Sequence, residues 1–269
     1  MNETRRVDYS AYLAQPSDAE QELLKLFRPN APLLICDIGC CEGEDSVRYA
    51  RRFPNARLLA FEPLPTNLAL ARENLDHHSV RNVELLGIAL SDRQGTARFH
   101  VSSGIPKDKF AGEDWNYGNK SSSLLPPAEK TPMYGWVRFD EVLEVATDTL
   151  DHVCEVRGIR HIDFIHLDVQ GAEHLVLAGA EEILPHTTAL WLEVADKQLY
   201  AGQPLRCEME QFLSRRGFVL GTEIRREAEG DQFYVNAHMP RVWPYLAGKC
   251  LSAAARRMAR VFRGQHAQR

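Results

Sequence analysis

Short apolar runs alternate along the chain with segments whose apolar residues recur at helical spacing. The runs have the length of β-strands and lie at 33–37, 57–62, 83–90, 163–168, 189–194, 218–224 and 233–237. The intervening pattern predicts helices at 17–28, 43–53, 65–76, 148–157, 172–184 and 205–216. This alternation is typical of an α/β fold in which helices cover both faces of a mostly parallel sheet.

The last two predicted strands are joined by the short polar loop REAEGD, residues 226–231. A loop of this length between two strands indicates a hairpin, and the strands of a hairpin are antiparallel. The sequence therefore predicts a Rossmann-like domain with a seven-stranded, mostly parallel sheet and an antiparallel last strand.

Residues 102–136 break the alternation, since they are rich in Gly, Ser and Pro and show little periodicity. A segment of this length inside a domain is typically a functional lid or disordered. Its aromatic residues favour an ordered surface. We expect a lid-like insertion that covers the substrate. The alternative is an insertion with a purely structural role.

The chain has 269 residues, of which 44% are hydrophobic and 26% charged, as in ordinary globular proteins. No apolar run approaches the roughly 20 residues of a membrane span, and the first nine residues contain no apolar signal core. The six cysteines form no CxxC pair, which argues against a disulfide framework or a zinc site. A cytoplasmic protein with reduced thiols is expected.

Charge is distributed unevenly. The net charge is −5, but residues 241–269 contain seven basic residues and no acidic one, so the preceding residues carry −5 − 7 = −12. This balance argues against a nucleic-acid-binding protein. The expected division is an N-terminal helical extension (1–32), a main domain (33–240) and a basic amphipathic C-terminal tail (241–269).

The apolar positions of the tail, from Trp243 and Ala247 through Cys250, Ala254, Met258 and Val261, recur at helical spacing. Such a helix could pack on the acidic body of the protein or on a second subunit. It could instead make peripheral contact with an anionic membrane surface, or the tail could be disordered. Packing is the favoured interpretation, and no oligomeric state is predicted.

The first predicted strand ends in the sequence CDIGCCEGEDS, residues 36–46, which contains the pattern DxGxxxG. Asp37 is expected in the crevice at the carboxyl end of the sheet, Gly39 at a sharp turn, and Gly43 where a ligand approaches the next helix. The dinucleotide fingerprint GxGxxG is not satisfied, which disfavours a nicotinamide dehydrogenase. An acidic loop suits the positively charged amino-acid end of S-adenosylmethionine better than it suits a pyrophosphate.

Two further strands support this cofactor. Glu62 ends the second predicted strand, where an acid can accept hydrogen bonds from both ribose hydroxyls. Asp92 follows the third and is expected near the adenine. We therefore predict that Asp37, Glu62 and Asp92 surround a single nucleoside, and that Asp37→Ala removes cofactor binding with little loss of fold.

Several motifs resemble those of FkbM-type methyltransferases and occur in the same order. They are CDIGCCEGEDS, AFEPLPTNLALARENL, IALSDRQGTARF, NKSSSLL, TDTLD, FIHLDVQGAEHLVLAGAEEIL and LWLEV, within residues 33–237. The resemblance implies a class I methyltransferase fold, S-adenosylmethionine as cofactor, and O-methylation of sugar or polyketide hydroxyls. It gives Asp37, Gly39, Gly43 and Glu62 cofactor-binding roles. The family usually has Ala-Asn at positions 40–41 and Lys at position 166.

Methyl transfer to a hydroxyl requires alignment of the acceptor and removal of its proton. Asp168, Glu173 and Glu193 are predicted catalytic carboxylates, since each lies at or just after a predicted strand end. One could be the general base, or two could hold a divalent cation; the cation is possible but not favoured. His166 and His174 are alternative bases. Asn119 and Ser121–Ser123 could bind acceptor hydroxyls.

The resulting hypothesis is an O-methyltransferase acting on a hydroxyl of a carbohydrate or glycosylated small molecule. Transfer to nitrogen or to a carboxyl group by the same fold is one alternative. A cofactor-binding module without turnover, acting as an interaction partner, is another.

Overall fold

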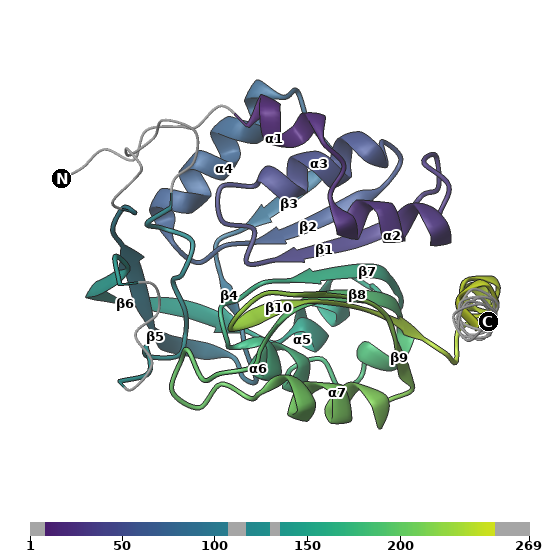
Figure 1. Cartoon of the computed structure of the whole chain (residues 1–269). Helices are drawn as coiled ribbons and strands as arrows, with labels where there is room; N and C mark the ends of the chain where they lie inside the picture. Colours follow the sequence, from purple (N-terminus) through teal and green to yellow (C-terminus); the bar gives the residue numbers. More distant parts are fainter. Residues whose placement is uncertain (1–8, 107–116, 130–134, 251–269) are drawn as a thin grey trace, which may run out of the picture.

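A single twisted sheet of seven strands forms the centre of the protein, in the order β3-β2-β1-β7-β8-β10-β9 (Figure 1). This computed structural model describes residues 9–106, 117–129 and 135–250. The strands of the sheet are β1 (Leu34–Ile38), β2 (Arg57–Phe61), β3 (Val83–Leu86), β7 (Ile162–Leu167), β8 (Thr187–Ala195), β9 (Phe218–Arg225) and β10 (Glu229–Asn236).

Strands β3, β2, β1, β7 and β8 run parallel, whereas β10 is antiparallel to both of its neighbours, β8 and β9. The predicted fold class and its antiparallel last strand are confirmed. However, β10 does not lie at the edge of the sheet. It inserts between β8 and β9, which leaves β9 at the edge.

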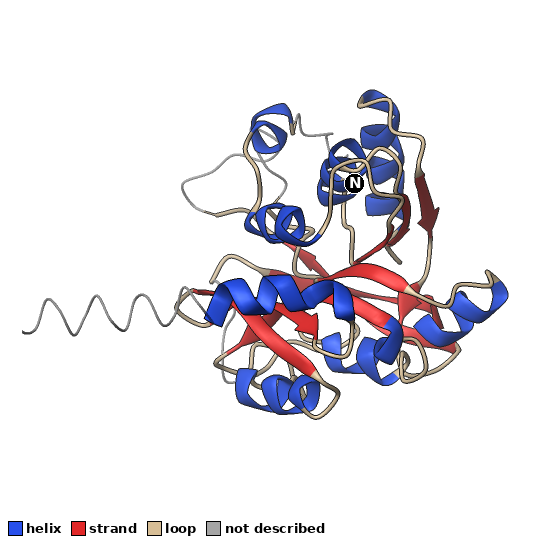
Figure 2. Ribbon diagram, turned by 90° about the vertical axis from the view of Figure 1, so that its right-hand side faces the viewer, coloured by secondary structure: helices blue, strands red, loops and turns tan. Residues whose placement is uncertain are grey.

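Helices lie on both faces of this sheet (Figure 2). They are α1 (Ser10–Ala14), α2 (Asp18–Leu26), α3 (Glu44–Arg52), α4 (Pro65–His77), α5 (Leu150–Val156), α6 (Glu173–Ala178) and α7 (Arg206–Ser214), with 3₁₀ turns η1 (Leu184–His186) and η2 (Pro240–Val242). Successive residues of a strand point to opposite faces. Accordingly, Ile35 of β1 packs in one core cluster and Cys36 in the other, and both are fully buried.

A second, three-stranded sheet was not anticipated. It has the order β4-β6-β5 and consists of β4 (Ala89–Leu90), β5 (Gly95–Ser103) and β6 (Arg138–Asp148). The predicted strand at 83–90 is therefore two strands in two sheets. Strands β5 and β6 bracket the predicted insertion, of which residues 107–116 and 130–134 lie outside the described residues.

The beginning of the C-terminal tail packs on the body of the protein. Val242 and Tyr245 are buried, and the Tyr245 hydroxyl donates to Glu22 of α2 at 2.7 Å. The predicted apolar face is wrong for this part of the tail, because Trp243 and Ala247, which were assigned to it, are exposed. Residues 251–269, on which the membrane alternative mainly rests, lie outside the described residues. No helix in the described part of the chain is long and apolar enough to cross a lipid bilayer.

Candidate active site

The loop after β1 is held against the end of β2. The backbone N–H groups of Gly39 and Cys40 both donate to the carbonyl oxygen of Phe61, each at 3.0 Å. Gly39 has φ +85°, and a Cβ added there would lie 1.9 Å from the carbonyl oxygen of Asp168. Only glycine fits this position, because the ends of β1 and β7 approach each other so closely.

Gly43, at the N-terminus of α3, has a different role from the one expected. A Cβ added there would meet Ala71 of α4 at 3.2 Å, and Gly43 lines neither pocket described below. The absence of a side chain therefore allows close packing of α3 against α4.

Asp37 is almost completely buried and forms a polar cluster with three neighbours. Its Oδ1 lies 3.4 Å from Nδ1 of His166, and its Oδ2 accepts from the Ser46 hydroxyl at 2.5 Å. The Tyr49 hydroxyl lies 3.3 Å from the same imidazole nitrogen. Burial by itself disfavours the imidazolium, but the hydrogen bond and charge of Asp37 outweigh it, and the pKa of His166 is raised to about 9. The position where the family usually has Lys therefore still carries a positive charge at neutral pH.

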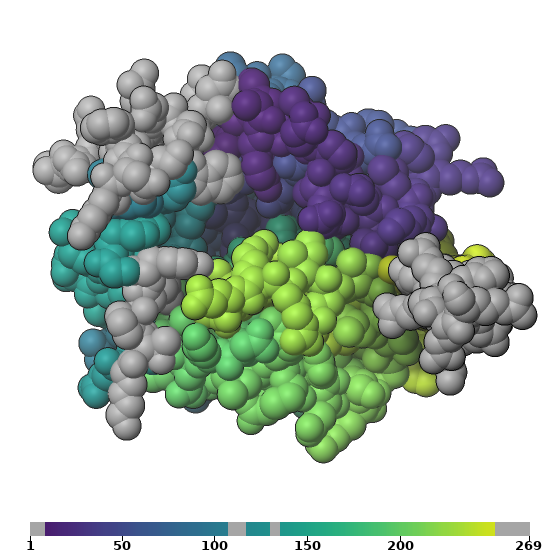
Figure 3. All heavy atoms as spheres, viewed as in Figure 1, coloured from purple at the N-terminus to yellow at the C-terminus, as the bar shows by residue number. Residues whose placement is uncertain are grey.

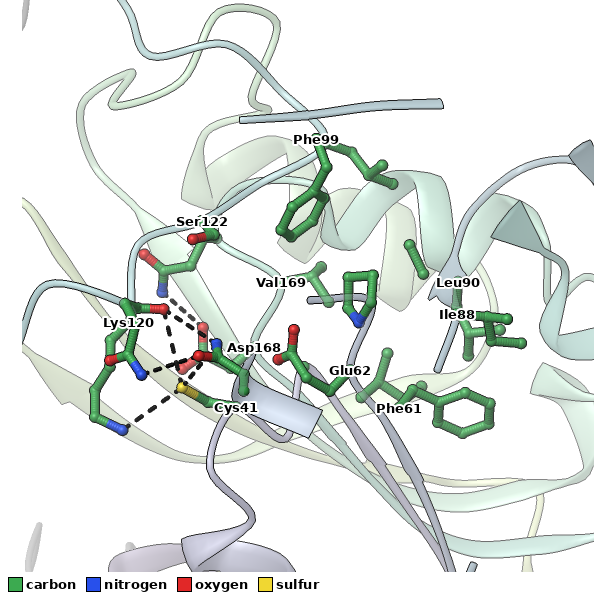
Figure 4. Close-up of a pocket in the computed structure, with 18 residues that line it drawn as sticks. Cys41, Phe61, Glu62, Ile88, Leu90, Phe99, Lys120, Ser122, Asp168 and Val169 are labelled. Carbon is green, nitrogen blue, oxygen red and sulfur yellow. Dashed lines mark hydrogen bonds between the residues drawn. The ribbon is translucent and has the colours of Figure 1, made fainter. Parts of the chain in front are cut away.

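The first pocket lies beyond the ends of β1, β2 and β7 and is bordered by β4 and β5 (Figure 4). It encloses about 520 Å³, including its open mouth. Apolar side chains of Ile88, Leu90, Phe99 and Val169 line one part of it. Glu62 lies opposite, buried at the end of β2, with Oε1 accepting from the backbone of Leu64 at 2.8 Å. Burial raises the pKa of Glu62 to about 8, against the effect of the hydrogen bonds it accepts.

Asp92 is not brought to this pocket. It is exposed, and its carboxylate accepts from the side chains of Ser91 and Arg93 at 3.2 Å and 3.1 Å. The reason is the division of the predicted third strand: β4 leaves the main sheet and pairs with β6, so the turn that follows it points elsewhere. The predicted arrangement of three acids around one nucleoside is thus not what the structure has.

The second pocket is larger, about 1080 Å³ with its mouth, and more polar. Asp37, His166 and Trp191 line it from the sheet, Tyr12 from α1, and Asp231 from β10. On the surface it corresponds to a hollow between the N-terminal helices and the β9–β10 hairpin (Figure 3). The N-terminal extension is therefore part of the site.

The two pockets meet. Gly39, Cys41, Lys120 and Asp168 line both of them, so a molecule bound in one can reach a molecule bound in the other at these residues. Of the predicted catalytic residues, Asp168 alone stands at this junction.

Asp168 is coupled to Glu193 through Gln170. The Gln170 amide nitrogen donates to Asp168 at 2.7 Å and to Glu193 at 3.0 Å, and its oxygen accepts from the Tyr200 hydroxyl at 3.1 Å. Burial raises the pKa of both carboxyl groups, and the hydrogen bond from Gln170 opposes the rise at Asp168. Glu193 lines neither pocket, so it lies behind Asp168.

The other two proposed bases do not face either pocket. Glu173 is buried, and its Oε1 accepts from the backbone of Val169 at 3.1 Å and of Gly171 at 3.2 Å, so it braces the loop that carries Gln170. Burial raises its pKa to about 7. His174 is partly buried, and burial lowers its pKa.

Sequence reasoning missed Lys120 and Cys41, whereas Glu44 belongs to the acidic loop that was expected to suit the positively charged end of the cofactor. Lys120 forms an ion pair with Glu44 and lies 3.7 Å from the Cys41 sulfur. The signal was present, because Lys120 belongs to the NKSSSLL motif. Its neighbour Asn119 lines the first pocket, with its amide nitrogen donating to Glu42 at 2.6 Å.

In the described part of the chain, no group of three or more His, Cys, Asp or Glu side chains is arranged to hold a metal ion. Asp168 and Glu193, two of the three carboxylates for which a divalent cation was considered, are bridged by the Gln170 amide nitrogen.

Comparison with known proteins identifies the family. The family model described as "Methyltransferase FkbM domain" matches residues 37–220, which contain all of these pocket-lining strand ends except those of β9 and β10. The chain belongs to the FkbM methyltransferase family. The prediction of an FkbM-type, S-adenosylmethionine-dependent methyltransferase is confirmed.

Two members of the family illustrate the similarity. The chain is 36% identical over 220 residues to the 2-O-methyltransferase NoeI of Sinorhizobium fredii (strain NBRC 101917 / NGR234), covering 81% of this chain and 85% of NoeI. It is 26% identical to the 31-O-demethyl-FK506 methyltransferase FkbM of Streptomyces tacrolimicus, covering 72% of this chain and 79% of that enzyme.

Among solved structures, the N-terminal domain of EvdMO1 with SAH bound has 13% identity and a TM-score of 0.45. The match covers 85% of this chain and 84% of that one.

Proposed function

We propose that the protein is an S-adenosylmethionine-dependent O-methyltransferase that acts on a hydroxyl of a carbohydrate or glycosylated small molecule. The observation that carries the proposal is the meeting of an apolar pocket and a polar pocket at Asp168. The first would take the nucleoside of the cofactor and the second the acceptor. The name of the 2-O-methyltransferase NoeI supports oxygen as the atom that is methylated.

The residues of the first pocket fit the cofactor. Apolar side chains such as Phe99 and Leu90 can border the adenine, and Glu62 can accept hydrogen bonds from the ribose hydroxyls. Two buried oxygens, Oδ1 of Asn119 in the first pocket and Oε2 of Glu44 in the adjoining second pocket, have no donor among the described residues. Buried polar atoms are nearly always hydrogen-bonded, so these two are suited to donors on a ligand.

The second pocket suits a polyhydroxylated acceptor. Aromatic side chains of Tyr12 and Trp191 offer apolar surface for a sugar ring, and the carboxylates of Asp37 and Asp231 offer hydrogen-bond acceptors. These contributions come from α1, the main sheet and β10, so the acceptor would lie between separate parts of the chain.

Bound S-adenosylmethionine would supply an electrophilic methyl group on a positively charged sulfur. Asp168 would accept the proton of the acceptor hydroxyl as the acceptor oxygen forms its bond to the methyl carbon and the bond from that carbon to sulfur breaks, leaving neutral S-adenosylhomocysteine. Gln170 would orient Asp168, and Glu193 would remain behind it. His166, paired with Asp37, would keep the adjacent wall of the second pocket fixed.

The test combines calorimetry with S-adenosylhomocysteine and transfer of a labelled methyl group to a panel of sugars, amines and carboxylic acids. We expect wild type to bind the product cofactor and label a sugar, and Asp168→Asn to bind it equally while losing transfer. Failure of wild type to bind, or labelling of amines or acids alone, would contradict the proposal. A parallel arm with EDTA tests the divalent-cation alternative.

A further inference from the structure

One oxygen of Glu44 lacks a partner although it is buried. Glu44 is the first residue of α3 and is only 7% exposed. Its Oε1 is held by the ammonium group of Lys120, whereas no described residue donates to its Oε2. A buried carboxylate oxygen without a donor is costly, so the site is expected to be completed by a group from outside the protein.

The position of this oxygen relative to the pockets indicates which group that is. Glu62 lies in the first pocket, and Glu44 lines the second, on the other side of the junction formed by Gly39 and Cys41. Lys120 reaches both pockets. A nucleoside whose ribose lies at Glu62 would therefore extend its 5′ substituent across the junction toward Glu44 and Lys120.

We propose that Glu44 and Lys120 form a clamp for the amino-acid end of the cofactor. Oε2 of Glu44 accepts from its α-ammonium group, and the Lys120 ammonium donates to its α-carboxylate. This inference rests on S-adenosylmethionine being the cofactor, as proposed above.

Hydrogen bonding and charge favour Glu44 over Asp37, another buried acid at this loop, as the partner of the ammonium group. Both oxygens of Asp37 already have partners in His166 and Ser46, whereas Glu44 has one oxygen without any described. Burial raises the pKa of Glu44, and the charge of Lys120 opposes the rise. A second ammonium group at Oε2 would oppose it further, because opposite charges stabilise the ionised form.

The clamp also assigns a role to the insertion. Lys120 comes from the segment between β5 and β6, so this segment would contribute to cofactor binding and not only to the acceptor side. It is joined to the β1–α3 loop a second time, since Asn119 donates to Glu42 at 2.6 Å.

The experiment compares two ligands by calorimetry: S-adenosylhomocysteine, which has the amino-acid end, and 5′-methylthioadenosine, which lacks it. In Glu44→Gln and in Lys120→Met we expect the affinity for S-adenosylhomocysteine to fall by about tenfold to a hundredfold, as for loss of a hydrogen bond to a charged group. Affinity for 5′-methylthioadenosine should change by less than about twofold, because this ligand lacks the ammonium and carboxylate groups that the clamp would hold.

Glu42→Gln is the matched control. Glu42 is a buried acid in the same loop, but its two oxygens already accept from Tyr9 and Asn119, each at 2.6 Å, so the ratio of the two affinities should equal that of wild type. The clamp would be wrong if the ratio of the affinities for S-adenosylhomocysteine and 5′-methylthioadenosine stayed at the wild-type value in both Glu44→Gln and Lys120→Met. This holds whether the two affinities are unchanged or decrease by the same factor. If wild type bound neither ligand, the proposed function itself would fail.

Discussion

Asp37 and His166 face each other across two neighbouring strands, with Oδ1 of the carboxylate 3.4 Å from Nδ1 of the imidazole. They are register partners in the parallel pair β1–β7. Both side chains are largely buried, with 3% and 14% of their surfaces exposed. A buried ion pair stabilises the folded protein only while both of its members are charged. The stability of the sheet should therefore depend on pH.

The first prediction is a loss of stability at alkaline pH. The pKa of His166 is about 9 in the folded protein and about 6.5 in an unfolded chain. Because the folded value is higher, the stabilisation is complete below about pH 6.5 and disappears as pH rises through about 9, with a size on the order of 3 kcal/mol. Urea unfolding between pH 6.5 and 9.5 should show this decline in wild type.

His166→Gln should remove most of the decline, and His166→Lys should retain a positive charge over the same range. Equal slopes of unfolding free energy against pH in wild type and His166→Gln would contradict the assignment of the pKa to this pair.

The second prediction revises an expectation drawn from sequence. Asp37→Ala was expected to remove cofactor binding with little loss of fold. The structure indicates a loss of about 3 kcal/mol in the free energy of unfolding near pH 7, because the buried His166 would lose the carboxylate that stabilises its protonated form. Adding His166→Leu should recover part of the loss. Urea unfolding of the two variants checks this, and a double variant no more stable than Asp37→Ala would argue against the coupling.

The third prediction concerns Gly39. Gly39→Ala should reduce stability by about 3 kcal/mol or more and abolish binding of S-adenosylhomocysteine, because its Cβ would meet the Asp168 carbonyl oxygen. Gly202→Ala is the matched control: Gly202 has φ +84°, close to the +85° of Gly39, but nothing lies within 4 Å of an added Cβ. It should cost only the backbone strain, about 1 kcal/mol. Similar losses in thermal or urea unfolding would mean that the contact is unimportant.

How much was predictable depends on how local each signal is. The buried strands are marked by continuous apolar runs, and their carboxyl ends place Asp37, Glu62 and Asp168 at one edge of a parallel sheet. Strands β5 and β6 carry many exposed polar residues, so their sequences lack such runs. They are defined by their pairing with each other, which joins residues 35 or more positions apart in the chain. The displacement of Asp92 follows from the same unpredicted sheet.

The side-chain partners were less accessible still. Lys120 lies in a segment without periodicity, so no pattern could direct it toward Glu44, 76 positions away in the chain. Glu173 and His166 lie where the sequence placed them. Only the structure indicates that one holds a loop and the other pairs with Asp37.

The fourth prediction is that Gln170 sets the pH dependence of methyl transfer. Its amide nitrogen donates to Asp168 at 2.7 Å and favours the ionised carboxylate that the proposed base requires. The charged or titratable groups of His166, Glu173, Glu193, Glu229 and Asp231 also act on Asp168 or its partner Glu193, and a change at Gln170 leaves all five in place. Gln170→Met keeps the length of the side chain and removes the donor. The pKa of Asp168 should then rise further.

The readout is kcat/KM against pH with the acceptor found by the labelled-methyl screen. In Gln170→Met the acidic limb of the profile should move to higher pH by about one unit, the equivalent of one hydrogen bond to a charged group, with the rate recovering at alkaline pH. Gln170→Glu, which adds a third carboxylate between Asp168 and Glu193, should move the limb in the same direction. Damage to the loop alone would lower the rate by one factor at every pH, because misplacement of a base does not alter which fraction of it is ionised. A uniform decrease in both variants would therefore assign Gln170 a structural role and leave the pH dependence of Asp168 to its charged neighbours.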